Sequence, residues 1–359
     1  MTIKADLLAT IVFGSLAMGA ARGVNARPLE IYFIDVEGGQ STLVVTPQGE
    51  TLLIDAGYAG DGTLPAKPGP AEQARDANRI LAVIHNAGVA QIDYLLVTHF
   101  HPDHFGGVAD LAKLLPIRTF IDHGTAAEVD RNTPAALDAL NRYVAVRATG
   151  RHIEPKPGDR LPLKGVEATV VSSAAATITT PIAGAGKDNP VCGPSARPAE
   201  NAGENPRSTG VVINFGKFRF LDIGDLTGQP LFNLVCPRDL IGPVDVYLVA
   251  HHGGADAAEP ATFAAFKPRV AVMNNGATKG GAPATYQALH LVPGLEDVWQ
   301  LHRAEGAATL NYAPARIANL DESSAHWIKV SAAESGAFRV TNGRTGESVS
   351  YPARESAPD

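Results

Sequence analysis

The run His99-Phe100-His101-Pro102-Asp103-His104 decides what this chain can be. It follows an apolar strand expected at residues 94–97, so the turn after that strand presents four potential ligands within six residues. His99 and His101 lie two apart in an extended stretch and can point to one side, whereas Asp103 and His104 can face a neighbouring ion. Imidazole and carboxylate together suit zinc, and also manganese or iron. The run therefore predicts one or two divalent metal ions, with zinc as the first choice.

Around this run, short β-branched segments alternate with turns and helical patterns. We expect helices at residues 71–86, 111–115, 135–146 and 260–266, and strands at 31–36, 42–46, 51–55, 117–121, 211–215, 218–222, 244–249 and 270–273. Residues 174–210 show no sustained period, and residues 327–351 look like short strands. The expected order of elements begins with strands only and then mixes strands and helices in two successive stretches. This order favours a layered α/β sandwich over a doubly wound sheet. The expected division is a main domain at 28–320 and a β-rich C-terminal extension at 321–359 packed on it.

The composition limits the classes of partner. The chain has 359 residues, 45% of them hydrophobic, and a net charge of -7. It contains no basic run, which argues against a broad nucleic-acid-binding surface. A metal could still supply the positive charge that an anionic substrate needs.

The N-terminus predicts export. Residues 1–27 resemble a signal peptide: Lys4 precedes an apolar run that is too short to span a membrane, and small residues follow. We therefore expect a periplasmic or extracellular protein with no membrane span after signal removal. An oxidising compartment would permit a disulfide between Cys192 and Cys236, but the sequence does not show whether they meet.

The pattern His-x-His-x-Asp-His after an apolar strand resembles the metallo-β-lactamase superfamily, of which it is among the most specific signatures. The resemblance implies a four-layered αββα sandwich and hydrolysis by a metal-activated water. It also implies that Asp103 positions this water and takes its proton. Residues 52–57 look like the family's early strand, in which Asp55 would hold the second N–H of a ligating imidazole.

Two later motifs follow in the family's order. Asp225, in the Gly-Asp after the strand at 218–222, matches the carboxylate that bridges the two metals. His251 and His252 follow the strand at 244–249; one should ligate while the other contacts substrate or a supporting group, and alternation does not decide which. The working assignment makes His251 the ligand and His252 a catalytic group. The expected ligands are then His99, His101, Asp103, His104, Asp225 and His251.

The paired histidines followed by glycine resemble a branch that contains the hydrolase-like domain of bacterial competence (DNA-uptake) proteins and certain phosphorylcholine esterases. Residues 35–41 look like a variant of that branch's opening motif, and Asn205 and Ser208 match its polar pair. Asn274 and His302 lie in regions that resemble its site-lining loops. The superfamily's middle histidine is missing, since residues 169–173 hold none. His123 follows the strand at 117–121 and is the candidate to reach the site instead.

The expected function is metal-dependent hydrolysis of a phosphodiester, or of an ester or amide, in a small molecule or at a polymer end. No Gly-x-Ser-x-Gly elbow is present in the sequence. Two alternatives stay open. The missing middle histidine favours a catalytically silent binding domain on the same fold. A β-lactam hydrolase is the other, because exported relatives on this fold perform that reaction. The sequence leaves the oligomeric state open.

Overall fold

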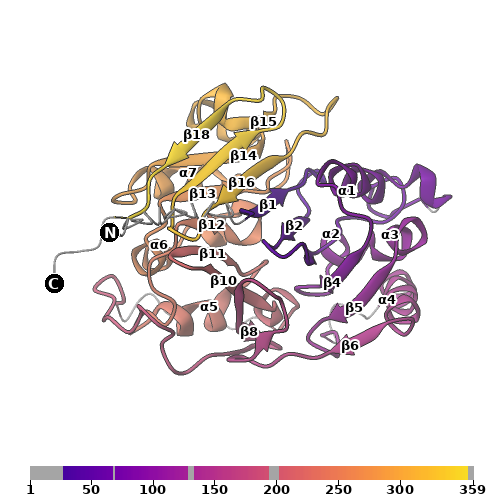
Figure 1. Cartoon of the computed structure of the whole chain (residues 1–359), viewed down its shortest axis with the longest axis horizontal. Helices are drawn as coiled ribbons and strands as arrows, with labels where there is room; N and C mark the ends of the chain where they lie inside the picture. The colour runs from indigo at the N-terminus through magenta and orange to yellow at the C-terminus, as the bar shows by residue number, and fades with distance from the viewer. Residues whose placement is uncertain (1–26, 68, 128–132, 194–201, 355–359) are drawn as a thin grey trace, which may run out of the picture.

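Two β-sheets face each other in the computed structural model of this chain, which describes residues 27–67, 69–127, 133–193 and 202–354. Helices cover the outer face of each sheet, so the layers run helix, sheet, sheet, helix (Figure 1). The αββα sandwich expected from the sequence is confirmed. The predicted signal segment, residues 1–27, lies outside the described residues apart from Arg27.

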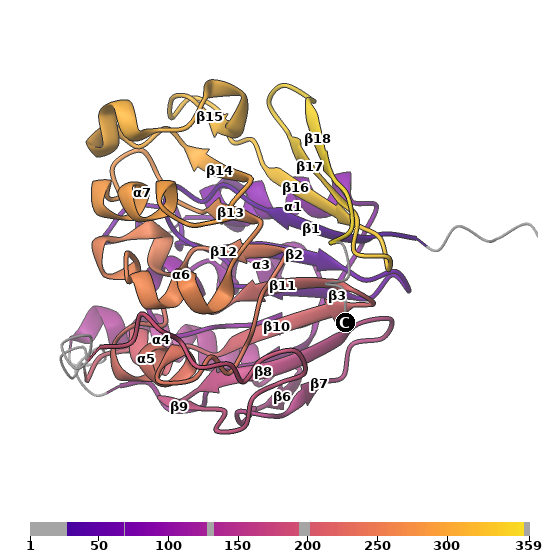
Figure 2. The same ribbon diagram turned by 90° about the vertical axis from the view of Figure 1, so that its left-hand side faces the viewer.

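The first sheet has the strand order β18-β17-β16-β1-β2-β3-β4-β5-β6. Strands β3 to β6 run parallel and the remaining neighbours pair antiparallel. The C-terminal strands extend this sheet beyond β1, as the yellow arrows of Figure 2 show. The strands are β1 (Leu29–Phe33), β2 (Thr42–Val45), β3 (Thr51–Ile54), β4 (Ile92–Leu96), β5 (Ile117–Ile121), β6 (Arg151–Ile153), β16 (Ile328–Ala332), β17 (Phe338–Asn342) and β18 (Ser348–Tyr351).

The second sheet has the order β15-β14-β13-β12-β11-β10-β8-β7, and β9 pairs with β8. Strands β11 to β15 run parallel, which requires the helical crossovers that cover this sheet. The strands are β7 (Arg160–Leu161), β8 (Glu167–Ser173), β9 (Ala176–Thr177), β10 (Gly210–Phe215), β11 (Phe218–Asp222), β12 (Val246–Leu248), β13 (Val270–Met273), β14 (Asp297–His302) and β15 (Ile317–Asn319).

Alternating side chains join the layers. In β1, Ile31 and Phe33 enter the core between the sheets, while Tyr32 faces the helices outside. Strand β11 does the same from the other side, and the rings of Phe33 and Phe220 meet edge to face with centroids 5.7 Å apart. This contact is one of those that pack the two sheets against each other.

Helices α1 (Arg75–Asn86), α2 (Pro102–Phe105), α3 (Val108–Leu114) and α4 (Pro134–Arg147) lie outside the first sheet. Helices α5 (Gly228–Val235), α6 (Pro260–Phe266) and α7 (Pro283–His290) cover the second. Short 3₁₀ turns are η1 (Ala71–Gln73), η4 (Asn205–Arg207), η5 (Ala250–Gly253), η6 (Ala255–Ala257), η7 (Glu305–Leu310) and η8 (Pro314–Arg316). Within the described part of the chain, no helix has the length and apolar character to cross a bilayer.

The helix predicted at residues 71–86 is divided in the structure. Residue Ala74 is extended (φ -67°, ψ 115°), so the 3₁₀ turn η1 ends before α1 begins at Arg75. The buried stripe of α1 includes Ala77, Ile80 and Ile84, which belong to the predicted apolar face. The helix predicted at residues 135–146 is α4, and the Thr133 hydroxyl accepts the Ala136 N–H as its N-cap.

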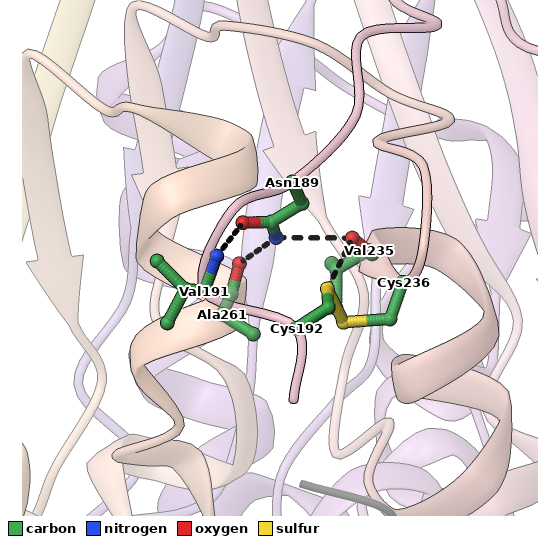
Figure 3. The surroundings of a disulfide bond; sticks show 6 residues. All are labelled: Asn189, Val191, Cys192, Val235, Cys236 and Ala261. Carbon is green, nitrogen blue, oxygen red and sulfur yellow. Dashed lines mark hydrogen bonds between the residues drawn. A yellow bond between two sulfur atoms is a disulfide. The ribbon is translucent and has the colours of Figure 1, made fainter. Parts of the chain in front are cut away.

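Cys192 and Cys236, whose pairing the sequence left open, form a disulfide with Cα atoms 5.7 Å apart (Figure 3). The bond ties the segment after β9 to the end of α5. Next to it, the Asn189 amide donates to Val235 O (3.0 Å) and Ala261 O (2.8 Å). An otherwise irregular segment is thereby fixed to the helices of the second sheet.

Replacing both cysteines by alanine should lower the free energy of unfolding by about 2–4 kcal/mol, because the bond closes a loop of 44 residues in the unfolded chain. Urea unfolding of the oxidised wild type and the double variant measures this difference. Dithiothreitol should bring the wild type to the variant's midpoint and leave the variant unchanged. Equal midpoints before reduction would contradict the prediction.

Candidate metal centre

The candidate site lies where strands of both sheets end. Asp55 follows β3 and the run 98–104 follows β4, whereas Asp225 and His252 follow β11 and β12 of the second sheet. Strands β3 and β4 pair in parallel, as do β11 and β12, so their carboxyl ends meet at one edge of the sandwich. Side chains from both halves of the chain therefore converge at this edge.

Four side chains form what we call the second ligand group: Asp103, His104, Asp225 and His252. His104 Nε2 lies 3.3 Å from His252 Nε2 and 3.2 Å from Asp225 Oδ2. Asp103 Oδ2 lies 3.3 Å from His104 Nε2 and 3.1 Å from His252 Nε2. A tetrahedral ion with ligand bonds of about 2.0–2.1 Å would separate its ligand atoms by about 3.3–3.4 Å. These spacings therefore fit one ion of zinc-like size.

His99, His101 and Asp225 form the first ligand group. His99 Nε2 lies 2.9 Å from His101 Nδ1 and 3.7 Å from Asp225 Oδ2. The carboxylate of Asp225 thus belongs to both groups. The first group has three members against four in the second, which leaves it the more open of the two.

Unsatisfied polar atoms support the same interpretation. Asp225 Oδ1 and His252 Nδ1 are buried and have no hydrogen-bond partner among the described residues. Burying a carboxylate oxygen without a donor is costly unless a cation balances it. The donor set is imidazole and carboxylate, so the residues present fit one or two divalent ions.

Asp55 and Thr98 orient the imidazoles from behind. Asp55 Oδ2 lies 2.7 Å from His104 Nδ1, and the same carboxylate accepts both the N–H and the hydroxyl of Thr98 at 2.7 Å. A histidine whose Nδ1 donates to a carboxylate presents the lone pair of Nε2, the nitrogen that faces the second ligand group.

The structure arranges the paired histidines differently from the working assignment, in which His251 was the ligand. His252 Nε2 enters the second ligand group, whereas His251 is 30% exposed and belongs to neither group. His251 Nδ1 lies 2.7 Å from Asp256 Oδ1, and its Nε2 lies 3.7 Å from Asp225 Oδ2, at the rim of the centre. Both histidines have left-handed backbones (φ 51° and 54°), so strand alternation does not apply to them.

Gly224 is required at the point where the end of β11 in the second sheet meets the end of β4 in the first. Gly224 has φ +53°, and a Cβ there would lie 2.8 Å from Thr98 Cβ. The residue before Asp225 must therefore be small and left-handed to place this carboxylate beside the His/Asp run.

Three polar residues expected near the site line its surroundings. The Asn205 amide lies 3.3 Å from His251 Nε2, and the Asn274 amide donates to Gln40 Oε1 at 3.3 Å. Asn205 Oδ1, Asn274 Oδ1 and the Ser208 hydroxyl are buried without partners among the described residues.

Two other candidates contact carboxylates away from both ligand groups. His123 Nε2 lies 2.8 Å from Glu204 Oε2, so it does not replace the missing middle histidine. His302 Nε2 lies 2.7 Å from Asp35 Oδ1, in a cluster that Arg79 also joins. Each of these two histidines thus lies against a carboxylate outside the two ligand groups, and His302 with Asp35 and Glu37 forms a separate cluster.

Sequence reasoning missed several groups that shape the site. Glu204 is fully buried and accepts the N–H of Phe100, which fixes the backbone between His99 and His101. Lys279 Nζ contacts Asp103 Oδ2 and donates to Tyr58 OH at 3.1 Å. A lysine in the Gly-rich segment after Asn274 was the available signal, but nothing local ties it to Asp103.

At the centre, neighbouring opposite charges shift the pKa values of Asp225 and His104 in the direction opposite to the effect of burial. Burial raises the pKa of Asp225, but His104 and His252 outweigh it and hold this pKa well below the usual range. Burial lowers the pKa of His104, but Asp225 and Asp103 raise it well above the usual range. His99 differs, because burial and the nearby His104 lower its pKa well below 6.5. Without a bound ion, this arrangement favours anionic Asp103 and Asp225, a neutral His99 and a protonated His104, so binding of a metal by His104 would release its proton.

Comparison with known proteins agrees with this geometry. Residues 34–184 match the family model of the metallo-beta-lactamase superfamily, a span that includes the run 99–104 and ends before Asp225. A curated protein of Polynucleobacter asymbioticus described as "UPF0173 metal-dependent hydrolase" is 27% identical over 172 residues. The alignment covers 48% of this chain and 50% of that protein, so the chain spans about half the length of this relative.

Solved structures resemble this chain at low identity. The metallo-beta-lactamase fold protein YhfI of Bacillus subtilis has a TM-score of 0.44 at 11% identity, over 76% of this chain and 96% of that one. CmlA, a diiron beta-hydroxylase of Streptomyces venezuelae, has a TM-score of 0.40 at 15% identity, over 69% of this chain and 45% of that one. The similarity to CmlA therefore spans less than half of that protein.

Asp222, buried behind the centre, provides a pH test. Burial raises its pKa from 3.8 to about 7, and the Gln40 amide donates to both of its oxygens. The pKa of Asp222 is higher in the folded than in the unfolded chain, so protonation of this carboxyl favours the folded state. Its stabilising contribution is fully present below about pH 4 and is lost as the pH rises to about 7. The stability of Asp222→Asn relative to wild type should therefore increase between pH 5 and pH 8, measured by urea unfolding. A difference that does not change with pH would contradict the assignment.

Proposed function

We propose that this chain, whose residues 34–184 match the family model of the metallo-beta-lactamase superfamily, is a metal-dependent hydrolase that cleaves a phosphodiester or a related ester. The observation that carries the proposal is the pair of ligand groups that share Asp225. The description of the Polynucleobacter relative as a metal-dependent hydrolase supports the same reaction type.

Bound divalent ions would supply a water molecule of lowered pKa and would polarise the substrate's ester oxygen. Asp103 contributes a carboxylate at the opening of the centre, in contact with Lys279. It is placed to orient the attacking water and to accept its proton. The water oxygen bonds to phosphorus, the P–O ester bond breaks, and the departing oxygen takes a proton to become an alcohol.

Lys279 supports an anionic substrate. Its side chain is 40% exposed while its ammonium reaches Asp103 and the Tyr58 hydroxyl, so a cation lies between the centre and solvent. A charged donor binds a phosphoryl oxygen more strongly than a neutral carbonyl. This preference favours a phosphodiester over an uncharged ester or amide.

Asp225→Ala should reduce bound metal to less than one equivalent and lower turnover by about 100-fold or more, because both ligand groups lose a member. Metal analysis after dialysis and turnover of bis-p-nitrophenyl phosphate with zinc or manganese measure the two effects. Asp321→Ala, on an exposed loop, is the matched control and should behave as wild type. Wild-type protein that holds less than about half an equivalent of metal would instead support a silent binding domain.

Lys279→Ala should raise KM for an anionic phosphodiester by about tenfold, the loss expected for one charged hydrogen bond. The KM for a neutral p-nitrophenyl ester should change much less, and Lys279→Arg should recover part of the loss. Lys113, which pairs with Asp110 on the surface, provides the control variant Lys113→Ala. Equal effects on both substrate classes would argue against a role in binding the anion.

A further inference from the structure

An apolar pocket of about 430 Å³ lies beside the first ligand group and shares one of its members, His101. His101 and Tyr58 line it on the side of the centre, and Phe105 of α2 also lines it. The first turns of α4 form another wall with Ala136 and Ala139. We call this space the alanine pocket. Its volume lies within the range of small-molecule sites.

The lining suits a hydrocarbon group. Leu64, Pro65 and Phe105 contribute apolar surface, and the polar share of the lining is small. Two charged residues border it, Asp138 and Arg142, but they pair with each other and are at least half exposed. A charge inside the pocket would therefore lose hydration without gaining a partner from these two residues.

The pocket exists partly because three of its lining residues on α4 are alanines. Ala135, Ala136 and Ala139 all line it from α4, where larger side chains would fill the space. Leu137, on the same helix, does not line it and is 44% exposed. Leu140 of the same helix also lines the pocket, so this wall has one large apolar side chain beside three small ones, and the small ones leave the space between them unfilled.

Two residues connect the pocket with the chemistry. His101 Nδ1 lies 2.9 Å from His99 Nε2 in the first ligand group, and the Tyr58 hydroxyl accepts from Lys279 Nζ. A substrate whose reacting bond lies at the centre can therefore place its charged part at Lys279 and one substituent in the pocket.

We propose that the substrate is an amphiphilic ester, with an anionic head at the His/Asp centre and an alkyl or aryl group in the alanine pocket. The inference rests on the proposed hydrolase function and adds the substrate class. Each methylene that enters the pocket should raise kcat/KM by about fourfold, until the pocket is full.

The test uses the full metal-loaded chain and a series of alkyl p-nitrophenyl phosphates from methyl to decyl. Wild type should show kcat/KM rising with chain length and then levelling off. Ala136→Trp should remove most of this rise, whereas Leu137→Trp, one residue away on the exposed face, should retain it. Ala135→Trp is a second variant, at an exposed position that tolerates a large side chain. A flat series in wild type, or an unchanged rise in both pocket variants, would overturn the proposal.

Binding of n-alkylphosphonates, which have no ester bond to cleave, separates the pocket from the reaction. Calorimetry should show affinity that increases with chain length in wild type and Leu137→Trp but not in Ala136→Trp. This result without any turnover of the phosphate series would support the pocket and refute the hydrolase. Turnover of the methyl substrate with no chain-length effect in either experiment would leave the hydrolase and overturn the pocket.

Discussion

The carboxylate of Asp225 is the interaction on which the centre depends, because both ligand groups share it. It comes from the end of β11, whereas His99, His101, Asp103 and His104 come from the end of β4 in the opposite sheet. Bringing these groups together removes ionised side chains from water, which is costly unless each gains a partner. The conformation of the surrounding backbone brings the carboxylates and imidazoles within hydrogen-bonding or ligand-sharing distance of one another.

Unusual backbone conformations occur next to Asp225 and at the paired histidines. Gly224 allows β11 to end directly against Thr98, and the consecutive left-handed residues His251 and His252 direct one imidazole inward and the other to the rim. Left-handed conformations cost energy for non-glycine residues and persist where the surroundings require them. Lys279 contacts Asp103 of the second ligand group, and the alanine pocket borders His101 of the first. The surroundings of the centre are therefore cationic at Lys279 and apolar at the alanine pocket.

Sequence patterns predicted the layers and most of the elements. Period-two alternation in β1 and the helical stripe of α1 are local properties, and each is visible without a partner. Helix α5 was missed, because Gly228 and Pro230 near its start obscure the pattern of the buried Leu231 and Leu234. The run 99–104 and the Gly-Asp of residue 225 identified much of the centre because they are compact motifs at strand ends.

The remaining site residues could not be predicted, for physical reasons. Whether His251 or His252 faces inward depends on two unusual backbone angles, which local sequence does not reveal. Tyr58, Glu204 and Lys279 reach the centre only after distant loops pack together, with Lys279 and Asp103 separated by 176 residues. The same holds for the disulfide, since Cys192 and Cys236 meet only when α5 packs on the second sheet.

The division of the ligands between the two sheets has a consequence for the stability of the whole fold. An ion held by His104 from one half and by Asp225 and His252 from the other would act as a cross-link between them. It would bind the folded chain and find no preformed site in the unfolded one, so its binding free energy would add to the free energy of unfolding by mass action. In that case, the supply of metal around this protein would affect the stability of the folded chain as well as the proposed reaction.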